Sequence, residues 1–567
     1  MVREDQTKET GVLGEGGYDP ILLQILWNRL IKIADEGHAA LVRTSFSTAV
    51  SESNDCAVVI TDAEGSSLAQ NAGAPPSFVH VLPSLVRYLL GKWPASRWRP
   101  GDVVVTNDPW LATGHLPDIT MVAPIFFRDR LVAFATSSAH TSDIGGSMWA
   151  ADVADAWEEG LRLLPVKLRR RGRLNRDLLD LVAANVRQPE LVLGDMHAQL
   201  AALEVVRRGL VELLDDLPAH DLPALAGAML ERAERAMRRA IAAIPDGDYR
   251  HEAELDGFEE PIRLKLKLTV AGSAVHLDFA GSSPQIDKGV NSVLNFTYAY
   301  AAYPLKCALD PATPQNEGAF RPITVAAPSG SILNPLFPAP VGARHLTGQV
   351  VSTLVLAALS AAIPDLAMAE SGATPALRAV LSGTRRDDRR FVTVLFASGG
   401  VGATAGHDGL HCTPFPTNTG CASLEVLESL APLRFHRREL LTDSGGAGER
   451  RGGCGQEIVV ELTAPQPARL STLAERLRNA AQGILGGGPG SPAALVLNGE
   501  RPVPGKARSS LAPGDALTIR YAGGGGYGDP RRRDRALVAA DLQNGLVSPE
   551  SARREYGYEP ESTEERR

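Results

Sequence analysis

The stretch from residue 101 to residue 146 constrains the fold of this chain most. It contains two apolar segments, residues 119–127 and 131–139, on either side of the polar trio Arg128-Asp129-Arg130. Two apolar runs joined by a short polar connection predict a β-hairpin, here with a three-residue loop. If the loop is centred on Asp129, the numbers of paired residues sum to 258, which places Asp118 opposite His140.

This register brings three polar side chains to the open end of the hairpin. Directly opposed side chains of an antiparallel pair sit roughly 5 Å apart at the β-carbon. His115 comes from the loop Gly114-His-Leu-Pro-Asp, in which proline disfavours a helix. Two imidazoles and a carboxylate suit a divalent metal. A His-x-x-Asp pair alone is more often a hydrogen-bonded loop, so the metal prediction depends on the hairpin register.

Pro124 bears on that register. A proline within a strand implies an edge position or a bulge, and a bulge shifts the pairing by one residue.

Length and composition exclude several classes of protein. With 567 residues the chain is too long for one ordinary core, so we expect two or three domains. A net charge of −8 argues against nucleic acid or an anionic membrane as the main partner. No apolar run approaches a membrane span, and the charged N-terminus lacks the apolar segment of a signal peptide. Five scattered cysteines without a Cys-x-x-Cys motif fit reduced thiols, and we expect a cytoplasmic protein.

The apolar periodicity predicts a mixed α/β (α+β), multi-domain fold. Asp19-Pro20 opens a helix, and residues 175–244 follow a helical pattern broken near Gln188-Pro189 and around residues 218–223. Near residue 246 the pattern changes to alternation, followed by short strands at 392–396, 457–462 and 516–521. We therefore expect a flexible arm at 1–17, an N-terminal metal-site domain with a helical segment at 18–245, a C-terminal, strand-rich and glycine-rich α/β domain at 246–530, and a helix with a tail at 531–567.

Three glycine-rich stretches invite a nucleotide-binding interpretation: residues 400–406, 444–453 and 523–528. A dinucleotide fingerprint needs a helix directly after its glycines to bind pyrophosphate, and none of these stretches opens one. No Gly-x-x-x-x-Gly-Lys-Ser/Thr motif occurs. The favoured interpretation is tight turns.

With these residues in view, the chain resembles the hydantoinase B/oxoprolinase family over almost its whole length, from Asp19 to about Tyr558. The family includes B subunits of ATP-dependent N-methylhydantoinases, part of 5-oxoprolinases, caprolactamases, and a subunit of acetone and acetophenone carboxylases. Its landmarks here are Glu52-Ser-Asn-Asp, Gly101-Asp-Val through Asn107-Asp-Pro, Gly114-His-Leu-Pro-Asp-Ile, His140-Thr-Ser-Asp-Ile-Gly-Gly, Glu159-Gly-Leu, Pro338-Ala-Pro-Val, Asp443-Ser-Gly-Gly-Ala-Gly and Gly526-Tyr-Gly-Asp-Pro.

The resemblance implies a metal site at Asp55, His115, Asp118 and His140. Three of these are the hairpin cluster, and Asp55 is added by the resemblance alone, since an isolated Asp before a strand is usually a turn former. Two histidines and two carboxylates suit Zn²⁺ or Mn²⁺. Three departures from the family pattern, at Ser53, residues 73–80 and residues 146–156, are expected to lie near the pocket and to affect substrate identity.

The resemblance also implies a function: the B-type subunit of an ATP-dependent hydrolase that opens a small cyclic amide such as a hydantoin, 5-oxoproline or a lactam. A separate hydantoinase A-type subunit would bind ATP and Mg²⁺ and phosphorylate the amide oxygen, in a heterotetramer or larger assembly. The metal would lower the pKa of bound water and supply hydroxide near neutral pH. Asp108 and Asp143 are candidates for general base or ligand support, and turn capping is the alternative role for both.

Two other functions stay open at this point. In the carboxylase branch of the family, the same metal would hold an enolate or enol phosphate for attack on CO₂, and ATP use would depend on bicarbonate. In the non-catalytic alternative, the chain is a metal-stabilised scaffold that holds partners together.

Overall fold

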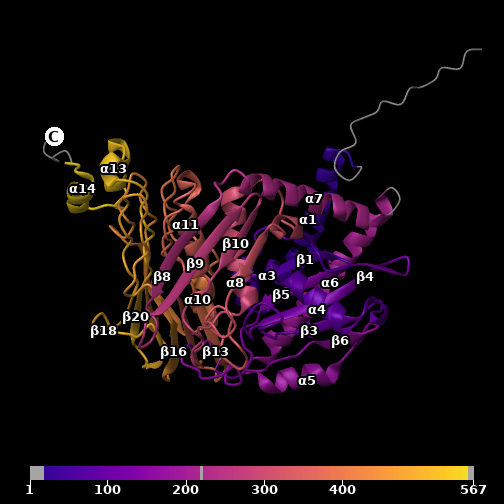
Figure 1. Cartoon of the computed structure of the whole chain (residues 1–567). Coiled ribbons are helices and arrows are strands. Elements are labelled where there is room, and N and C mark those ends of the chain that lie inside the picture. Colours follow the sequence, from indigo (N-terminus) through magenta and orange to yellow (C-terminus); the bar gives the residue numbers. More distant parts are fainter. Residues whose placement is uncertain (1–17, 148, 218–220, 560–567) are drawn as a thin grey trace, which may run out of the picture.

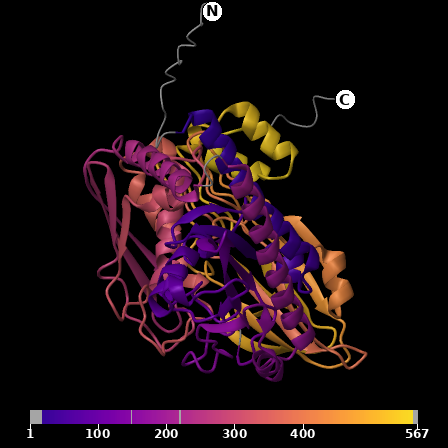
Figure 2. The same ribbon diagram turned by 90° about the vertical axis from the view of Figure 1, so that its right-hand side faces the viewer.

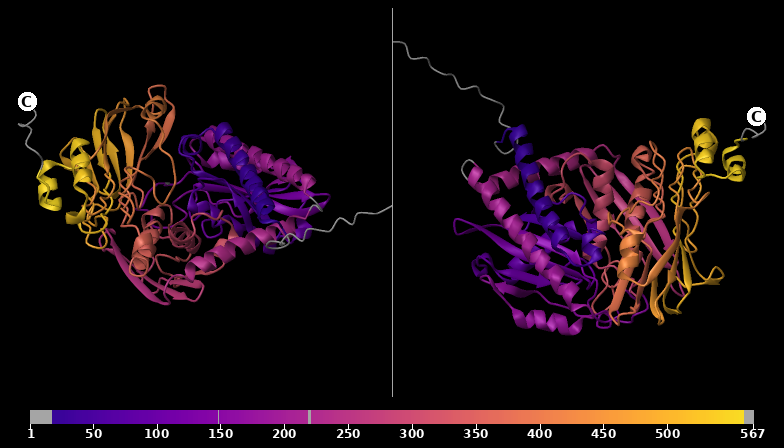
Figure 3. Two further views of the ribbon diagram at one scale, coloured as in Figure 1. Left: turned by 90° about the horizontal axis from the view of Figure 1, so that it is seen from above. Right: turned by 180° about the vertical axis from the view of Figure 1, so that it is seen from behind.

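A computed structural model describes residues 18–147, 149–217 and 221–559 of the chain. Three parts follow one another along the chain and across the molecule: a large sheet with long helices, a smaller sheet, and a C-terminal pair of sheets (Figures 1 and 3). Helices and mostly antiparallel sheets occur together, with one parallel pair between β10 and β11, which confirms the mixed α/β, multi-domain fold. The predicted arm at residues 1–17 and the end of the predicted tail lie outside the described residues.

The first part is built on a seven-stranded sheet in the order β2-β1-β5-β4-β3-β6-β7. Its long helices begin where the sequence predicts. Asp19 Oδ1 accepts hydrogen bonds from the amides of Ile21 and Leu22 and caps α1. The strands are β1 (Cys56–Asp62), β2 (Ser67–Gln70), β3 (Val103–Thr106), β4 (Asp118–Phe127), β5 (Arg130–His140), β6 (Val166–Arg170) and β7 (Arg173–Leu174). The helices are α1 (Pro20–Thr44), α2 (Thr48–Ser51), α3 (Pro76–Val79), α4 (Leu82–Lys92), α5 (Arg176–Asn185), α6 (Pro189–Asp216) and α7 (Leu222–Ile241).

The β4–β5 hairpin has the predicted register at its open end, where Asp118 pairs with His140. The predicted three-residue loop is wrong. The turn contains two residues, Arg128 and Asp129, both at positive φ (47° and 62°), as a primed two-residue turn requires. A register shift between Ile125 and Phe126 then adds the missing residue, so that pairs sum to 257 near the turn and to 258 towards the open end.

The second part is a four-stranded sheet in the order β11-β10-β9-β8, with helices packed beside it (Figure 1). In β9 the buried and partly exposed residues alternate strictly, as predicted. The elements are β8 (Gly247–Leu255), β9 (Ile262–Ala271), β10 (Ala274–Asp278), α8 (Leu294–Leu309), α9 (Glu317–Phe320), β11 (Ile323–Ala326), α10 (His345–Gly348) and α11 (Val350–Leu359). The predicted boundary near residue 246 falls at the start of β8 and stays a prediction, while one apolar cluster contains residues from both sides of it.

The third part contains two more sheets, in the orders β13-β12-β16-β19 and β14-β15-β20-β17-β18, which share an apolar core. Their elements are β12 (Arg378–Thr384), β13 (Arg390–Phe396), α12 (Leu424–Leu430), β14 (Leu433–Leu440), β15 (Gln456–Leu462), β16 (Ala468–Leu473), β17 (Ala494–Leu497), β18 (Arg501–Pro502), β19 (Lys506–Leu511) and β20 (Ala516–Arg520). Helices α13 (Arg535–Gln543) and α14 (Pro549–Tyr556) follow, and they lie at the upper left of the molecule in Figure 1 and at its top in Figure 2. Among the described residues, no helix is both long and apolar enough to cross a membrane.

The glycine-rich stretches pack against one another, and the tight-turn interpretation is wrong for most of their glycines. Gly400, Gly452 and Gly524 keep ordinary φ values and contact neighbouring backbone. A β-carbon on Gly400 would lie 1.8 Å from the carbonyl oxygen of Gly453, and one on Gly452 would lie 1.9 Å from that of Gly524. Backbone hydrogen bonds link the segments, for example Gly524 N to Gly453 O at 2.9 Å. Glycine is needed here because backbone approaches backbone, and not for a left-handed conformation.

Candidate metal centre

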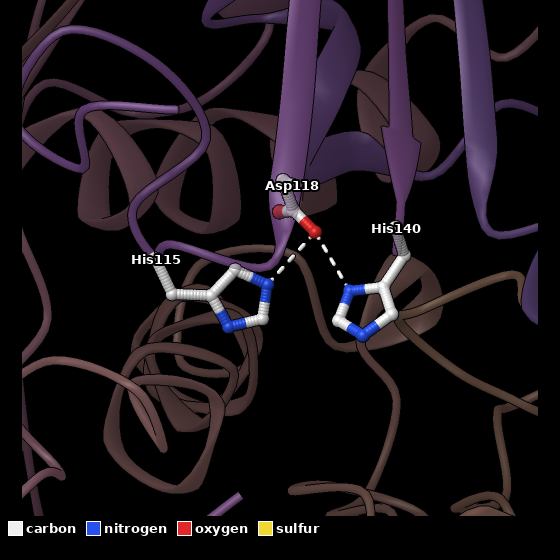
Figure 4. A group of neighbouring side chains, drawn as sticks. All are labelled: His115, Asp118 and His140. Atoms are coloured by element: carbon white, nitrogen blue, oxygen red, sulfur yellow. Dashed lines mark hydrogen bonds and ion pairs between the residues drawn. The ribbon is translucent and has the colours of Figure 1, made fainter. Parts of the chain in front are cut away.

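Three side chains predicted from the hairpin converge at its open end (Figure 4). Asp118 is the first residue of β4, His140 is the last residue of β5, and His115 lies in the loop before β4. Asp118 Oδ1 is 2.8 Å from His115 Nε2 and 2.7 Å from His140 Nδ1. One ligand atom from each residue lies within 4.8 Å of the others, and all three residues are buried. The 2.7 and 2.8 Å distances are those of hydrogen bonds, and the proximity of one ligand atom from each of the three residues makes them candidates to share a cation.

His115 is held in one orientation by a backbone carbonyl. Its Nδ1 lies 3.2 Å from Gly342 O, and because a carbonyl only accepts, Nδ1 carries the proton. Burial is the largest cause that lowers the pKa of His115, to about 4, so the ring is neutral near pH 7. Its Nε2 therefore directs a lone pair at the Asp118 carboxylate. Two acceptors 2.8 Å apart need a positive charge between them.

Arg344 keeps Asp118 ionised. Its Nη2 donates to Asp118 Oδ2 at 2.9 Å, and its Nε donates to Thr113 O at 2.8 Å. Burial acts to raise the pKa of Asp118, but His115, His140 and Arg344 outweigh it and hold that pKa well below its usual range. Asp118 thus presents one oxygen to Arg344 and the other to the imidazoles. A buried carboxylate in this state is a strong ligand for a divalent cation.

Asp55 stands beside this cluster at the start of β1. Its carbonyl oxygen accepts from the His140 amide at 3.0 Å, which extends the β1–β5 ladder by one residue. The carboxylate oxygen Oδ2 lies 4.0 Å from His140 Nδ1. Burial is the largest cause that raises the pKa of Asp55, whereas the charge of His140 lowers it. Asp55 therefore lies beside the cluster and is nearest to it at His140.

The cluster lines a cavity of about 50 Å³, which has room for a cation and a few waters. Residues from all three parts of the fold surround it. The first part contributes Ser77, Phe78 and Trp149, the second contributes Phe296, Tyr300 and Gln349, and the third contributes Arg378, Phe396 and Thr419. Two of the three segments that depart from the family pattern, residues 73–80 and 146–156, therefore reach the cavity, and Ser53 is not among its lining residues.

Trp149 closes one side of the cavity. Its ring centroid lies 4.9 Å from that of His140 and 6.5 Å from that of His115. Its backbone has φ 62°, which is rare for a bulky side chain and marks local strain. Ser471 of β16 donates a hydrogen bond to the Trp149 carbonyl, which stabilises this backbone conformation and so helps to position the indole.

The donor set fits a metal ion. His115 Nε2 and His140 Nε2 are buried and have no hydrogen-bond partner, so imidazole lone pairs are available at the cluster. Two imidazole nitrogens with one or two carboxylates are the ligand types that Zn²⁺ and Mn²⁺ take in proteins.

Asp108 and Asp143, the predicted general bases, are not among the cavity residues. Asp108 Oδ2 accepts from Arg162 Nε and Nη2 at 3.0 and 2.6 Å, and its Oδ1 accepts from the Trp110 amide. Asp143 accepts from Arg187 and from the amides of Gly145 and Gln188. The hydrogen bonds from backbone amides are those expected if both aspartates cap turns. A catalytic role for either aspartate stays a prediction.

Three residues at the site were not predicted from the sequence: Arg344, Trp149 and Glu159. Glu159 Oε1 accepts from the amides of Val341 and Gly342 at 2.7 and 2.5 Å and so fixes the carbonyl that binds His115. Burial raises the pKa of Glu159 to about 8. An available signal for Arg344 is that it is the only Asp, Glu, Lys or Arg residue between Ala339 and Val355.

Comparison with known proteins gives one consistent result. The profile of the family described as Hydantoinase B/oxoprolinase matches residues 19–530. A protein of Pseudomonas sp. (strain NS671), provisionally named as the B subunit of a D-/L-hydantoinase, is 31% identical, with 96% of each chain covered. The beta subunit of caprolactamase from Pseudomonas jessenii is 30% identical, covering 95% of this chain and 96% of the relative.

Two solved structures share the fold. The crystal structure of ATP-dependent caprolactamase from Pseudomonas jessenii has a TM-score of 0.88 and 28% identity, covering 96% of this chain and 97% of that one. A nucleotide-free structure of acetone carboxylase has a TM-score of 0.87 and covers 95% of this chain and 79% of that one. At 20% identity, the second likeness shows the fold alone.

Proposed function

Because the chain belongs to the hydantoinase B/oxoprolinase family, we propose that it is the B-type subunit of an ATP-dependent hydrolase of cyclic amides. We propose further that Asp55, His115, Asp118 and His140 hold a divalent cation, Zn²⁺ or Mn²⁺. The observation that carries both proposals is the buried convergence of two imidazoles on an ionised carboxylate at the wall of a cavity.

A divalent cation held there supplies a Lewis acid that lowers the pKa of water enough to provide a nucleophile near pH 7. The chain's own residues prepare the site. Gly342 O fixes the His115 tautomer, and Arg344 keeps Asp118 ionised. Glu159 supports the Gly342 peptide from behind. Such partners orient ligands and raise their basicity.

Arg378 gives the cavity a charge suited to an anionic reactant. Its Nη1 donates to the carbonyls of Leu377 and Ala397, and its Nη2 lies 3.5 Å from Thr419 Oγ1, so these partners are neutral. Among the described residues, no carboxylate forms an ion pair with Arg378. A buried guanidinium paired only with neutral oxygens favours an anion beside it. A phosphorylated amide, made by an ATP-binding partner, is such an anion and a better electrophile than the amide.

The partner in this proposal is a hydantoinase A-type subunit that binds ATP and Mg²⁺. The two relatives described above are named as a B subunit and a beta subunit, and these names support a multi-subunit assembly. We propose a heterotetramer or larger assembly.

The test is to co-express the chain with a hydantoinase A-type subunit, to purify the complex, and to measure its metal content. ATP consumption is then screened with hydantoins, 5-oxoproline, lactams and ketones, with and without bicarbonate. The expected result is ATP-dependent ring opening by the complex with about one divalent cation per chain of this type.

The controls separate the competing functions. Replacement of His140 by Ala is expected to abolish ring opening while the complex stays assembled; loss of assembly without any measurable turnover in the wild type supports the scaffold instead. ATP use that needs a ketone and bicarbonate assigns the chain to the carboxylase branch. Turnover by this chain alone, without ATP or partner, overturns the proposal.

A further inference from the structure

A second cavity, of about 340 Å³, lies apart from the metal centre. Its walls are the edge strand β2, helices α4, α8 and α9, and the chain around His80. The two cavities use different faces of the same elements: Phe296 and Tyr300 of α8 line the first, whereas Asn295 and Tyr298 line the second. Likewise Ser77 and Phe78 line the first cavity, and His80 lines the second.

The wall of this second cavity is polar, and three of its polar residues, Ser67, His80 and Asn316, are buried. Ten of its fourteen lining residues carry polar side chains: Ser67, Gln70, His80, Ser84, Arg87, Asn295, Tyr298, Gln315, Asn316 and Glu317. Two of them have unpartnered buried atoms. Ser67 is 4% exposed and its Oγ has no hydrogen-bond partner; Asn316 is 1% exposed and its Nδ2 has none. Buried polar groups are nearly always satisfied, so these two point to a polar ligand.

Two opposite charges stand at the same wall. Arg87 Nη1 and Glu317 Oε1 are 3.1 Å apart, with side chains 43% and 27% exposed. Arg87 also donates to Gly65 O and Ser84 Oγ, which holds the guanidinium in place. Because a partly exposed pair contributes only about 0–1 kcal/mol, a ligand can exchange partners with it at small cost. Glu317 disfavours a purely anionic ligand, Arg87 disfavours a purely cationic one, and a hydrocarbon leaves the polar wall unsatisfied.

We propose that this cavity binds a small zwitterion, an amino acid whose carboxylate pairs with Arg87 and whose ammonium pairs with Glu317. Ser67 and Asn316 then donate to its polar groups. Neutral His80, whose pKa burial lowers to about 3, packs edge-on against Phe320 at 4.2 Å between ring centroids and forms part of the wall without adding charge.

The chemistry of the proposed function identifies a source of this ligand. Hydrolysis of a lactam breaks the ring C–N bond, adds the hydroxyl of water to the carbonyl carbon and leaves the proton on nitrogen, so one molecule carries a carboxylate and an ammonium. The ring-opened product of a lactam is therefore an amino acid zwitterion, whereas a hydantoin gives a product without the ammonium. This identification rests on the proposed function, but the site itself depends only on the cavity.

The test is isothermal titration calorimetry of the full-length chain without metal, ATP or partner, using 6-aminohexanoate, L-glutamate, hexanoate and hexylamine. We expect at least one zwitterion to bind and each singly charged analogue of 6-aminohexanoate to bind about ten-fold more weakly or not at all. Arg87→Gln and Glu317→Gln should each weaken zwitterion binding by about ten-fold. The matched control is Arg207→Gln, which removes one member of the exposed Arg207–Glu204 pair on α6 and should leave binding unchanged.

Ser67→Ala separates ligand binding from a structural role. Removal of an unpartnered buried hydroxyl should leave the thermal midpoint of the ligand-free chain unchanged or raise it, while zwitterion affinity falls. A lower midpoint with unchanged affinity overturns the assignment, as does the absence of heat from either zwitterion up to about 10 mM. Equal binding of hexanoate and 6-aminohexanoate overturns it as well. Because calorimetry needs no turnover, the binding result can be interpreted even if the chain proves not to be a hydrolase. Turnover without zwitterion binding rejects this site and leaves the proposed function standing.

Discussion

Asp118 and His140 form the last pair of the β4–β5 ladder, and Asp118 Oδ1 lies 2.7 Å from His140 Nδ1. The β1–β5 ladder meets the same end of β5, where the His140 amide donates to Asp55 O. Asp118 and His140 thus lie at the ends of two strands, Asp55 directly precedes a third strand of the same sheet, and His115 comes from the loop before β4. Ligands on rigid strands are held more precisely than ligands on loops.

Replacement of His140 by Ala should abolish tight binding of the cation. The variant keeps the backbone hydrogen bond to Asp55 but removes one nitrogen ligand, and we expect affinity for Mn²⁺ or Zn²⁺ to fall on the order of 100-fold. Equilibrium dialysis followed by elemental analysis measures this directly. His197→Ala is the matched control, since His197 is exposed on α6. Equal metal content in wild type and His140→Ala contradicts the proposed centre.

Replacement of Arg344 by Gln should destabilise the metal-free chain more than the metal-loaded chain. Without the guanidinium, the buried Asp118 carboxylate loses its cationic partner, at a cost of about 3–5 kcal/mol. A bound cation takes over that role, so the loss of thermal midpoint should be smaller with Mn²⁺ than with EDTA. Arg29→Gln, which opens an exposed pair with Asp216, should cost less than about 1 kcal/mol in both conditions. If Arg344→Gln lowers the thermal midpoint equally with and without metal, the cation does not replace the guanidinium as partner of Asp118.

Glu159 should make the stability of the chain depend on pH. Its folded pKa of about 8 lies above the ordinary value of 4.5, so the native state keeps a proton that the unfolded state has lost. The contribution is therefore complete below pH 4.5 and is lost as pH rises towards 8. Glu159→Gln keeps an oxygen acceptor for Val341 and Gly342 and cannot ionise. We expect this variant to be more stable than the wild type at pH 8 and equal to it at pH 4.5.

Denaturant titrations between pH 4.5 and 8.5 measure that difference. Glu159→Ala is the comparison variant, because it also cannot ionise but leaves the two amides without an acceptor. It should be less stable than Glu159→Gln at every pH. If Glu159→Gln follows the wild-type curve throughout, the carboxyl is ionised in the native state and the argument fails.

The hairpin shows what local sequence can predict. Two apolar runs around a short polar connection are enough to predict the pairing between Asp118 and His140. Both faces of the two strands are largely buried, so it is the position of the turn, and not an alternation of apolar and polar residues, that predicts the register. The turn itself was predicted incorrectly. The observed two-residue turn is followed by a bulge, and together they shift the pairing as far as a three-residue loop would. Both arrangements therefore pair the same residues at the open end. Pro124 lies just before the bulge and beyond the last β4 residue paired with β3, Val122, so its missing N–H removes no bond of the β3–β4 ladder.

The site also shows where local sequence fails. Arg344 reaches Asp118 across 226 positions, and Trp149 is fixed by Ser471 across 322. No spacing rule connects such residues, since their contacts depend on how the three parts of the fold pack. Asp55 was found only through the family resemblance. Glu159 was recognised as part of a landmark but received no role, because its function depends on the buried peptide of Gly342.

The glycine-rich core provides a prediction with a control only four residues away. Gly402 and Gly406 lie in one stretch that was predicted to form turns. A β-carbon on Gly402 would lie 1.9 Å from Ala369 O, whereas one on Gly406 would meet nothing within 4 Å. Gly402→Ala should therefore cost about 3 kcal/mol or more, because backbone must move away from backbone. Gly406→Ala should leave stability within about 1 kcal/mol, since reduced freedom of the unfolded chain offsets any loss. Thermal unfolding and the yield of folded chain compare the two variants, and equal tolerance of both substitutions shows that the extended segments are not packed backbone against backbone.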